Sequence, residues 1–376
     1  MASTTLSAVG VLCGTLAGRS GDIEDAGRLP ADIVGPLRDT GVFGMWLAAE
    51  LGGQEARPSE VIAVLTALAE ADASVGWCAA IGLASNLISG YLPRDGAEEV
   101  YATGREIVGG SLMPTGRATR TGPDELTVTG RWAFASGAHH SDYLAVAAIL
   151  TDTNTPRPLL VVMPRSEVQL LDTWHVLGLK GTGSTDIQAD AVRVPTRHST
   201  PADDLTPWPA GTMWRIPLHS LLLPIMATVP LGIARAALTE LTTLAGTKTP
   251  FRSQRTLAER DSTQATLAHA TAGVDAAAGY LTATMTALFD TAREGTPPTL
   301  TQRATARLAA VHATHVAADA VQNAYRTAGT TALHLTNPLQ RHLRDVSTCT
   351  QHYALSPNGY ETTGKVLLGL PPDGPL

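Results

Sequence analysis

Cysteine is scarce in this 376-residue chain, which contains only Cys13, Cys78 and Cys349. Three widely spaced cysteines without a CxxC pair argue against a disulfide framework and against a zinc site. The scarcity favours a reducing compartment, and we expect a cytoplasmic protein. No basic segment precedes an apolar stretch at the N-terminus, so we expect no signal peptide.

Charged residues are also few. They make up 16% of the chain against 44% hydrophobic residues, and the net charge is −7. Nucleic-acid binding needs a basic surface for phosphate contacts, and no basic run occurs, so we do not expect a nucleic-acid partner. The composition and length predict a globular protein with a large core and two or three packed layers or domains.

Two further features are missing. No GxGxxG sequence follows a first strand, which argues against a tightly held Rossmann dinucleotide. The close pair His312 and His315 has no accompanying carboxylates, so no metal site is expected. One long apolar run, residues 216–238, contains three prolines and Arg235. This polarity predicts a buried helix pair rather than a membrane span.

The residue pattern changes along the chain from helical to β-prone and back to helical, which predicts three domains at residues 1–105, 106–215 and 216–376. Helical patterns occupy the first and third parts, at residues 31–39, 60–70, 97–103, 258–289 and 300–329. Short β-prone runs occupy the middle, at residues 107–108, 126–134, 144–150, 159–163, 168–171 and 187–194. The fold class is therefore α+β, mostly α.

The most informative segment is residues 130–143, GRWAFASGAHHSDY. The preceding alternation predicts a strand that ends in Trp132 and Phe134. The small Ala-Ser-Gly unit that follows lets the backbone approach a flat group, because glycine has no Cβ in the way. A planar ring with polar edges would suit this segment, but so would an ordinary hairpin with both aromatic side chains in a core.

This segment resembles the flavin-facing signature of the acyl-CoA dehydrogenase superfamily. Within that superfamily it is similar to the two-component flavin-dependent monooxygenases called group D. Four more blocks agree in the family's order: residues 29–43 (LPADIVGPLRDTGVF) continued by 50–53 and 69–77, residues 108–118 (VGGSLMPTGRA), residues 174–184 (WHVLGLKGTGS) with 192–195, and residues 338–346 (PLQRHLRDV) with His352.

The resemblance implies an N-terminal helical domain, a middle β-barrel and a C-terminal four-helix bundle that assembles as a homotetramer. It implies an oxygenase component that receives reduced flavin, FADH2 or FMNH2, from a separate reductase. O2 would then form a C4a-hydroperoxyflavin that hydroxylates an aromatic or natural-product substrate. Three alternatives stay open: an N-oxygenase acting on an amine or amino sugar, an acyl-CoA dehydrogenase-like FAD oxidoreductase, and a non-catalytic scaffold.

The resemblance also assigns cofactor residues. Trp132, Phe134, Ser136 and Gly137 would form a wall and a hydrogen-bonding group at the flavin, with Ser136 near the flavin N5. Thr182 and Ser184 lie in a small-residue loop whose backbone amides can hold a phosphate. Arg252 would reach the cofactor of a neighbouring subunit.

Four residues are expected on the substrate side: Trp77, Met113, His139 and the catalytic His352. Of the adjacent His139 and His140, only one would face the pocket, because neighbours on a strand point oppositely. Ser136 is the second residue with a catalytic role.

His352 decides the reaction class. The superfamily's dehydrogenases use a carboxylate base, in many members shortly after an Arg-Asp pair. Here Arg344 and Asp345 are followed by no carboxylate until Glu361, and His352 lies between them. Imidazole titrates near neutral pH, so His352 could take a proton from a phenol or amine, or stabilise the oxygenated flavin. A structural histidine is the other interpretation.

Overall fold

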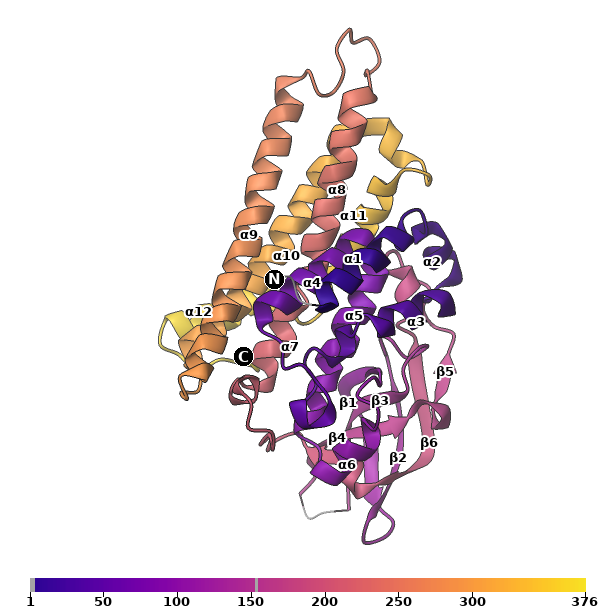
Figure 1. The fold of residues 1–376 in the computed structure, drawn as a ribbon, viewed down its shortest axis with the longest axis vertical. Helices are drawn as coiled ribbons and strands as arrows, with labels where there is room; N and C mark the ends of the chain where they lie inside the picture. Colours follow the sequence, from indigo (N-terminus) through magenta and orange to yellow (C-terminus); the bar gives the residue numbers. More distant parts are fainter. Residues whose placement is uncertain (1–3, 153–154) are drawn as a thin grey trace.

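A computed structural model describes residues 4–152 and 155–376 of the chain. The N-terminal part is helical (Figure 1). Its helices are α1 (Thr4–Leu16), α2 (Ser20–Ala26), α3 (Ala31–Asp39), α4 (Pro58–Ala71), α5 (Ala73–Ser85) and α6 (Arg94–Val100). Asp72 caps α5 by accepting hydrogen bonds from the backbone amides of Ser74 and Val75, which satisfies two of the donors that a helix leaves free at its start.

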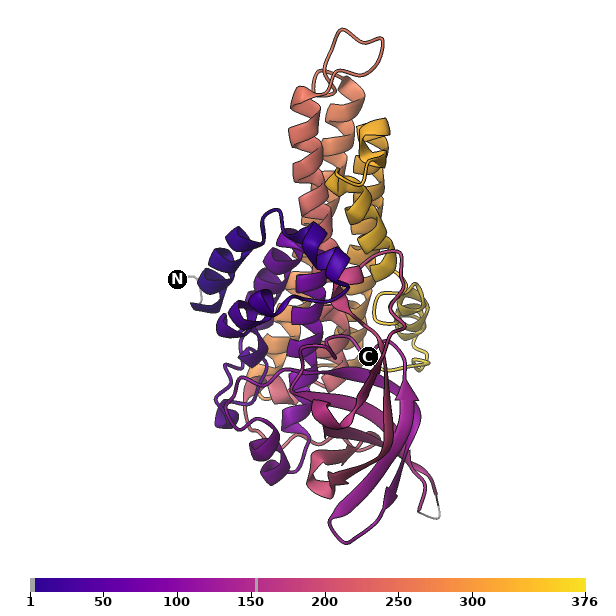
Figure 2. The same cartoon turned by 90° about the vertical axis from the view of Figure 1, so that its right-hand side faces the viewer.

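The middle part is one seven-stranded sheet in the order β5-β6-β2-β1-β3-β4-β7. Figure 2 shows how strongly this sheet is curved below the helices. Its strands are β1 (Val108–Arg120), β2 (Glu125–Trp132), β3 (Tyr143–Leu150), β4 (Arg157–Pro164), β5 (Gln169–Leu171), β6 (Asp186–Pro195) and β7 (Ser199–Pro201). Strands β1 and β3 pair in parallel, and the other neighbouring strands of the described sheet are antiparallel. The edge strands β5 and β7 do not pair with each other within the described residues.

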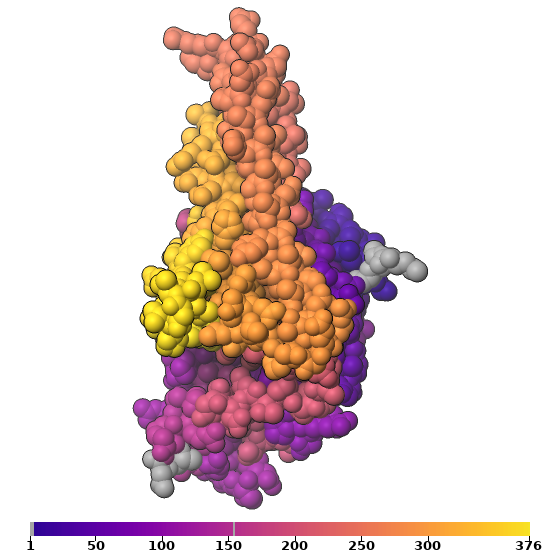
Figure 3. All heavy atoms as spheres, turned by 90° about the vertical axis from the view of Figure 1, so that its left-hand side faces the viewer, coloured from indigo at the N-terminus to yellow at the C-terminus, as the bar shows by residue number. Residues whose placement is uncertain are grey.

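The C-terminal part is a tall helical bundle (Figure 1). It contains α7 (Leu218–Ile225), α8 (Thr228–Thr247), α9 (Asp261–Arg293), α10 (Leu300–Ala328), α11 (Pro338–Cys349) and α12 (Asn358–Leu367). The long helices α9 and α10 run side by side, and Figure 3 shows the C-terminal segment beside their lower ends. Thr299 and Gln302 form a capping box at the start of α10, which fixes where this helix begins.

The apolar run at residues 216–238 forms the helix pair α7–α8, as predicted. Two apolar segments, Ala73–Gly90 and Leu218–Thr247, are long enough to cross a membrane, but they are 89% and 83% buried inside the structure. They are therefore core helices of this fold, because their apolar surface is covered by protein.

The strand prediction at residues 107–108 was too short, because β1 has 13 residues. The glycines of this strand explain the difference. A Cβ on Gly116 would lie 2.1 Å from the Trp132 ring. Gly116 therefore makes room for the indole, which packs in the sheet's own core cluster. A glycine that signals a loop in sequence here accommodates a large neighbour within a strand.

Candidate functional site

Four of the predicted site residues are joined in one hydrogen-bonded row. The Trp77 indole Nε1 donates to Ser136 Oγ at 3.2 Å. Ser136 Oγ and Ser184 Oγ lie 2.8 Å apart, and Ser184 Oγ and Thr182 Oγ1 also lie 2.8 Å apart. Thr182 Oγ1 then donates to the Leu179 carbonyl at 2.8 Å. The row joins helix α5 to two loops of the middle part, over 100 residues of chain.

Close packing brings Trp77 to this place. A Cβ on Gly76 would lie 2.5 Å from Ala69 of helix α4, so the glycine lets α5 lie directly against α4. Ser136 is positioned by the sheet, because the Gly110 amide of β1 donates to the Ser136 carbonyl. Backbone packing thus positions Trp77 and Ser136 so that their side chains can form a hydrogen bond.

His352 joins the row through Trp77. The two rings meet edge to face with their centroids 5.1 Å apart, a favourable arrangement for aromatic rings. His352 Nδ1 accepts the backbone N–H of Ala354 at 3.2 Å. A neutral imidazole has one donor and one acceptor nitrogen, so the ring proton is on Nε2.

The charge state of His352 differs from the sequence-based expectation. Burial, and then the nearby Arg307 guanidinium, lower the pKa of His352 to about 4. The imidazole is therefore neutral at neutral pH. With Nδ1 occupied by a backbone amide, His352 offers a hydrogen-bond donor at Nε2. The prediction that it titrates near neutral pH is corrected accordingly: the group suits donation better than proton abstraction.

Helix α11 holds the loop that carries Thr182 and Ser184. Asp345 Oδ1 accepts the Leu179 amide at 2.6 Å. A Cβ on Gly178 would lie 2.2 Å from the Arg344 carbonyl, so the loop backbone rests on the helix. The Arg344 guanidinium donates twice to the Glu24 carboxylate, at 2.6 and 3.0 Å, and once to the Leu177 carbonyl.

Asp345 is buried with few compensating charges. Its burial, followed by the proximity of Asp72, raises the pKa of Asp345 to about 7, although the Leu179 amide opposes this shift. The sequence-based reasoning used Asp345 only as a landmark before His352. Its contact with the loop could not be found from spacing, because the partners are 166 residues apart.

Phe134 lies on the surface beside the row. Its side chain is 67% exposed, and its ring meets Trp174 edge to face at 6.3 Å. The Phe134 backbone has a φ of +60°, which turns the chain out of the strand direction. Phe134 thus presents an exposed aromatic ring that packs on the partly buried Trp174, close in sequence to the buried Ser136 hydroxyl. It suits contact with a flat ring.

The predicted histidine pair lies in a turn rather than on a strand, so the expectation that only one of them faces the site does not apply. His139 is half-buried against Gly183, where a Cβ would lie 2.6 Å from its ring. Both ring nitrogens of His140 are buried without a hydrogen-bond partner among the described residues. Burial lowers the pKa of His140 to about 4.

Three other predicted residues lie apart from the row. Trp132 is fully buried, and its Nε1 donates to the Ala147 carbonyl at 2.8 Å. It therefore cannot form a wall for a bound flavin, and that prediction is corrected. Met113 is 58% exposed on β1. Arg252 lies in the loop between α8 and α9, at the far tip of the bundle, with its guanidinium over the Phe251 ring.

These residues fit a flavin. The row supplies hydroxyl groups for a polar edge, Phe134 supplies an exposed aromatic face, and Gly137 supplies a close approach at a φ of +77°. Neither ring nitrogen of His140 has a hydrogen-bond partner among the described residues. Its Nε2 would lie 3.5 Å from a Cβ on Gly137, so the ring lies beside this glycine. Buried polar atoms without partners are rare in folded proteins, and a bound group is one of the ways in which they are satisfied. A flavin would supply the electron-transfer and oxygen chemistry that these side chains lack.

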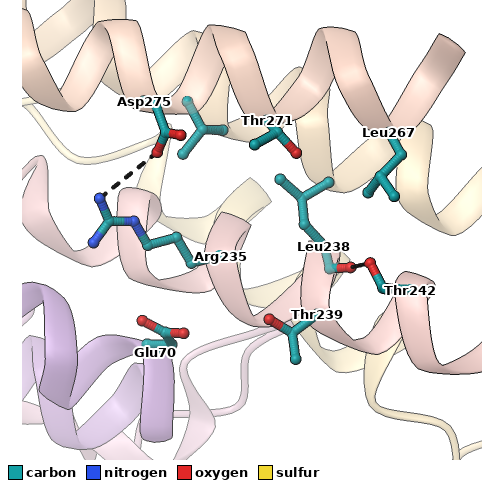
Figure 4. Close-up of a pocket in the computed structure, with 9 residues that line it drawn as sticks. Glu70, Arg235, Leu238, Thr239, Thr242, Leu267, Thr271 and Asp275 are labelled. Atoms are coloured by element: carbon teal, nitrogen blue, oxygen red, sulfur yellow. Dashed lines mark hydrogen bonds and ion pairs between the residues drawn. The ribbon is translucent and has the colours of Figure 1, made fainter. Parts of the chain in front are cut away.

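Two hollows occur elsewhere, in the helical bundle. One of about 300 Å³ lies between α8 and α9 and includes Glu70, Arg235 and Asp275 (Figure 4). The other, of about 380 Å³, lies between α9 and α10. In the first, Arg235 and Asp275 form a loose ion pair at 3.9 Å, and the rest of the lining is leucine, valine and threonine. Neither hollow contains a residue of the row. Among the described residues no three His, Cys, Asp or Glu side chains gather as a metal site.

Comparison with known proteins first defines the class. The family model for the acyl-CoA dehydrogenase N-terminal domain matches residues 11–103, and the model for the C-terminal domain matches residues 225–357. Crystal structures share the fold over nearly the whole chain. The protein XiaF from Streptomyces sp., in complex with FADH2 and glycerol, has a TM-score of 0.92, 24% identity and coverage of 99% of this chain and 96% of that chain.

Two relatives define the family more closely. An indole-3-acetate monooxygenase from Acinetobacter baumannii is 30% identical over 94% of this chain and 91% of the relative. The oxygenase component of an FADH2-dependent resorcinol hydroxylase from Rhizobium sp. is 29% identical over 93% of this chain and 90% of the relative. The chain therefore belongs to the flavin-dependent monooxygenases of the acyl-CoA dehydrogenase superfamily. It is an oxidoreductase of the two-component kind, in which the oxygenase uses reduced flavin.

Proposed function

We propose that this oxygenase component hydroxylates an aromatic substrate at the Trp77–His352 end of the hydroxyl row. The observation that carries the proposal is the convergence of Trp77, Ser136, Ser184 and Thr182 by hydrogen bonds, with His352 packed on Trp77. Ser136 would meet the flavin, and the His352 Nε2–H would donate to an oxygen atom beside it.

The surroundings of the row support an aromatic substrate. Large apolar side chains are exposed close in sequence to residues of the row and to His352, namely Phe134, Leu177 and Tyr353. Aromatic and apolar side chains with a few oriented polar groups are typical of small-molecule sites. The relatives named for indole-3-acetate and resorcinol act on aromatic rings, and we propose the same substrate class here.

The dehydrogenase alternative lacks a base at this place. The only carboxylate close in sequence before His352 is Asp345, which is 5% exposed and accepts the Leu179 amide. A base must reach the proton that it removes, and this carboxylate is directed into the protein. N-oxygenation of an amine uses the same flavin chemistry, so it stays the second candidate and is an outcome of the test below.

The assembly we propose has three parts: this oxygenase, a separate flavin reductase, and further copies of this chain in a homotetramer. Phe251 is 90% exposed at the tip of the bundle, beside Arg252. An exposed aromatic residue next to a cation at that tip supports contact with a neighbouring copy, where Arg252 would reach the cofactor. The three free thiols support a reducing, cytoplasmic location.

The test mixes the protein and anaerobically reduced FAD or FMN with O2, in the presence of a panel of phenols, indole-3-acetate and amines. We expect an oxygenated aromatic product, and little product from the amines. Ser136→Ala should make the oxygenated flavin decay about 5- to 150-fold faster and so raise hydrogen peroxide release, because a lost hydrogen bond to a reacting group costs about 1–3 kcal/mol. An N-oxygenated product as the main outcome would favour the second candidate, and reduction of bound FAD by an acyl-CoA would refute the proposal.

A further inference from the structure

A single peptide group lies between the Arg307 side chain and the His352 ring. Arg307 Nη2 donates to the Tyr353 carbonyl at 2.8 Å. The Ala354 N–H, which belongs to the same peptide bond, donates to His352 Nδ1 at 3.2 Å. This bond is planar and trans, so its C=O and N–H point in opposite directions. The guanidinium and the imidazole therefore bind the two ends of one peptide group.

The Arg307 guanidinium is a buried charge without a carboxylate. The residue lies on α10 and is 4% exposed, and no Asp or Glu of the described residues forms an ion pair with it. Arginines are almost never fully buried without a charged partner. The contacts of this one are the carbonyls of Tyr353 and Ala354 and the Tyr353 ring, whose centroid lies 5.6 Å from Cζ. These contacts all belong to the two residues that follow His352.

Helix α12 packs closely over this arginine. A Cβ on Gly359 would lie 2.5 Å from Val311 and 3.3 Å from Arg307 Nε, so the glycine lets α12 rest directly on α10. The Thr363 hydroxyl of α12 also donates to the Ala304 carbonyl of α10 at 3.1 Å. Figure 3 shows the C-terminal segment against the lower part of the long helices. The guanidinium is therefore enclosed by the packing of two helices, which fixes its place relative to the turn after His352.

The charge on Arg307 strengthens the hydrogen bond at the far end of the peptide group. A cationic donor at the carbonyl oxygen polarises the amide, and hydrogen bonds in series reinforce one another. The Ala354 N–H therefore holds Nδ1 as an acceptor, and the ring proton stays on Nε2. We infer that Arg307 is a positioning residue for His352, which it orients through the peptide between Tyr353 and Ala354 so that the imidazole presents its Nε2–H. This inference rests on the proposed function, in which that N–H donates to an oxygen atom beside the flavin.

The groups around His352 support this role. Burial, and then Arg307 of α10, lower the pKa of His352 to about 4. On the other sides, the uncharged Trp77 indole of α5 meets the ring edge to face. Cys349 of α11, whose carbonyl accepts the His352 amide, keeps its thiol proton because burial raises its pKa. The Tyr353 ring lies against the guanidinium. A positive charge on the imidazole is thus opposed by Arg307, and no carboxylate of the described residues is paired with either group.

The experiment observes the protonation of His352 directly and needs no substrate. The full chain is isotope-labelled in its histidine rings, and proton–nitrogen correlation spectra distinguish a proton on Nδ1 from one on Nε2. The His352 signal is assigned by its loss in His352→Gln. We expect the wild-type ring to be neutral between about pH 6 and 8, the range in which an ordinary histidine loses its charge, and to carry its proton on Nε2.

Two substitutions separate the charge of Arg307 from its packing. Arg307→Lys and Arg307→Gln each keep a nitrogen that can donate to the Tyr353 carbonyl, but only Arg307→Lys keeps the charge. In Arg307→Gln we expect the pKa of His352 to shift upward and a population with the proton on Nδ1 to appear. Its product yield should fall about 2- to 12-fold, the equivalent of one hydrogen bond. Arg307→Lys should keep the wild-type ring state and lose less product. Arg326→Gln, which changes an exposed arginine of the same helix, is the control and should alter neither readout.

Two results would overturn the inference, and a third would overturn only the proposed function. A wild-type His352 that carries its proton on Nδ1, or that gains charge between about pH 6 and 8, refutes the inference without any variant, so the test does not depend on whether a variant folds. Identical His352 spectra in Arg307→Gln and Arg307→Lys would show that the arginine only supports packing, whatever the loss of yield. If the ring follows the charge of Arg307 as expected but the wild type forms no oxygenated product, the proposed function fails and the positioning of the ring stands.

Discussion

Asp345 makes the stability of this protein depend on pH, and the size of the effect can be worked out. Burial raises the pKa of Asp345 to about 7 in the folded chain, against an ordinary value of 3.8. Between these two values the unfolded chain has lost the proton while the folded chain keeps it. The folded state then binds more protons, so stability falls as pH rises through this window.

The slope is about 1.4 kcal/mol per pH unit for one proton. Between about pH 5 and pH 7 this group therefore lowers the free energy of unfolding by about 2.3 kcal/mol, because the slope diminishes close to the folded pKa. This is a large part of the stability of a typical domain. Above the folded pKa the contribution becomes constant. Asp345→Asn has no proton to lose and keeps an oxygen that can accept the Leu179 amide, so it should remove this pH dependence.

The assay is urea unfolding of wild type and Asp345→Asn at about pH 5 and about pH 8. The difference in unfolding free energy between the two proteins should shift in favour of the variant by about 2.5 kcal/mol at the higher pH. Asp190→Asn, on the exposed surface of β6, is the control and should follow the wild type. Parallel pH curves for wild type and Asp345→Asn would refute the reasoning, since they would mean that Asp345 ionises equally in both states.

Two further predictions concern the site and the sheet. His352→Ala should lower product yield about 5- to 150-fold through loss of one hydrogen bond. Wild type and variant should keep the same pH profile between about pH 6 and 8, because burial and Arg307 lower the pKa of His352 to about 4. A neutral-range titration present only in the wild type would restore the general-base role. Gly116→Ala should destabilise the fold by about 1–3 kcal/mol in denaturant unfolding, since its Cβ would lie 2.1 Å from Trp132. The control is Gly122→Ala, whose Cβ would meet only Glu125 at 3.7 Å. Equal stability of the two variants would contradict the steric argument.

The sequence predicted the long helices well, because α9 and α10 have helix-forming composition and clear breaks between them. It did not predict helix α5, which carries Trp77. Nearly every residue of α5 is buried, so its apolar residues cover all sides of the helix and show no helical period. The cap at Asp72 was the one local signal that could have located it.

The two aromatic residues at the end of β2 show a different limit. Alternation along a strand places Trp132 and Phe134 on the same side, and both were expected to face the flavin. The strand ends at Trp132, and Phe134 has a φ of +60°. The Trp132 side chain is therefore buried in the core of the sheet, whereas the Phe134 side chain is exposed. A positive φ at a phenylalanine is rare, and nothing in the local sequence indicates it.

The row itself was predicted only as separate residues. The resemblance supplied Ser136, Thr182, Ser184 and Trp77 individually, but hydrogen bonds among residues up to 59 positions apart depend on how the helices dock on the sheet. The same holds for the clamp on the loop by Arg344 and Asp345, whose partners are set by tertiary packing.

The clamp between α11 and the loop at Gly178 has a consequence for how the enzyme is made. Residues 177–184 are held by contacts with a helix more than 160 positions later in the chain. Contacts of such large sequence separation form late, because much chain must be ordered before they are gained. A partly folded or truncated chain can therefore contain helices and a sheet without a flavin site. Flavin binding during refolding should therefore appear after the secondary structure has returned.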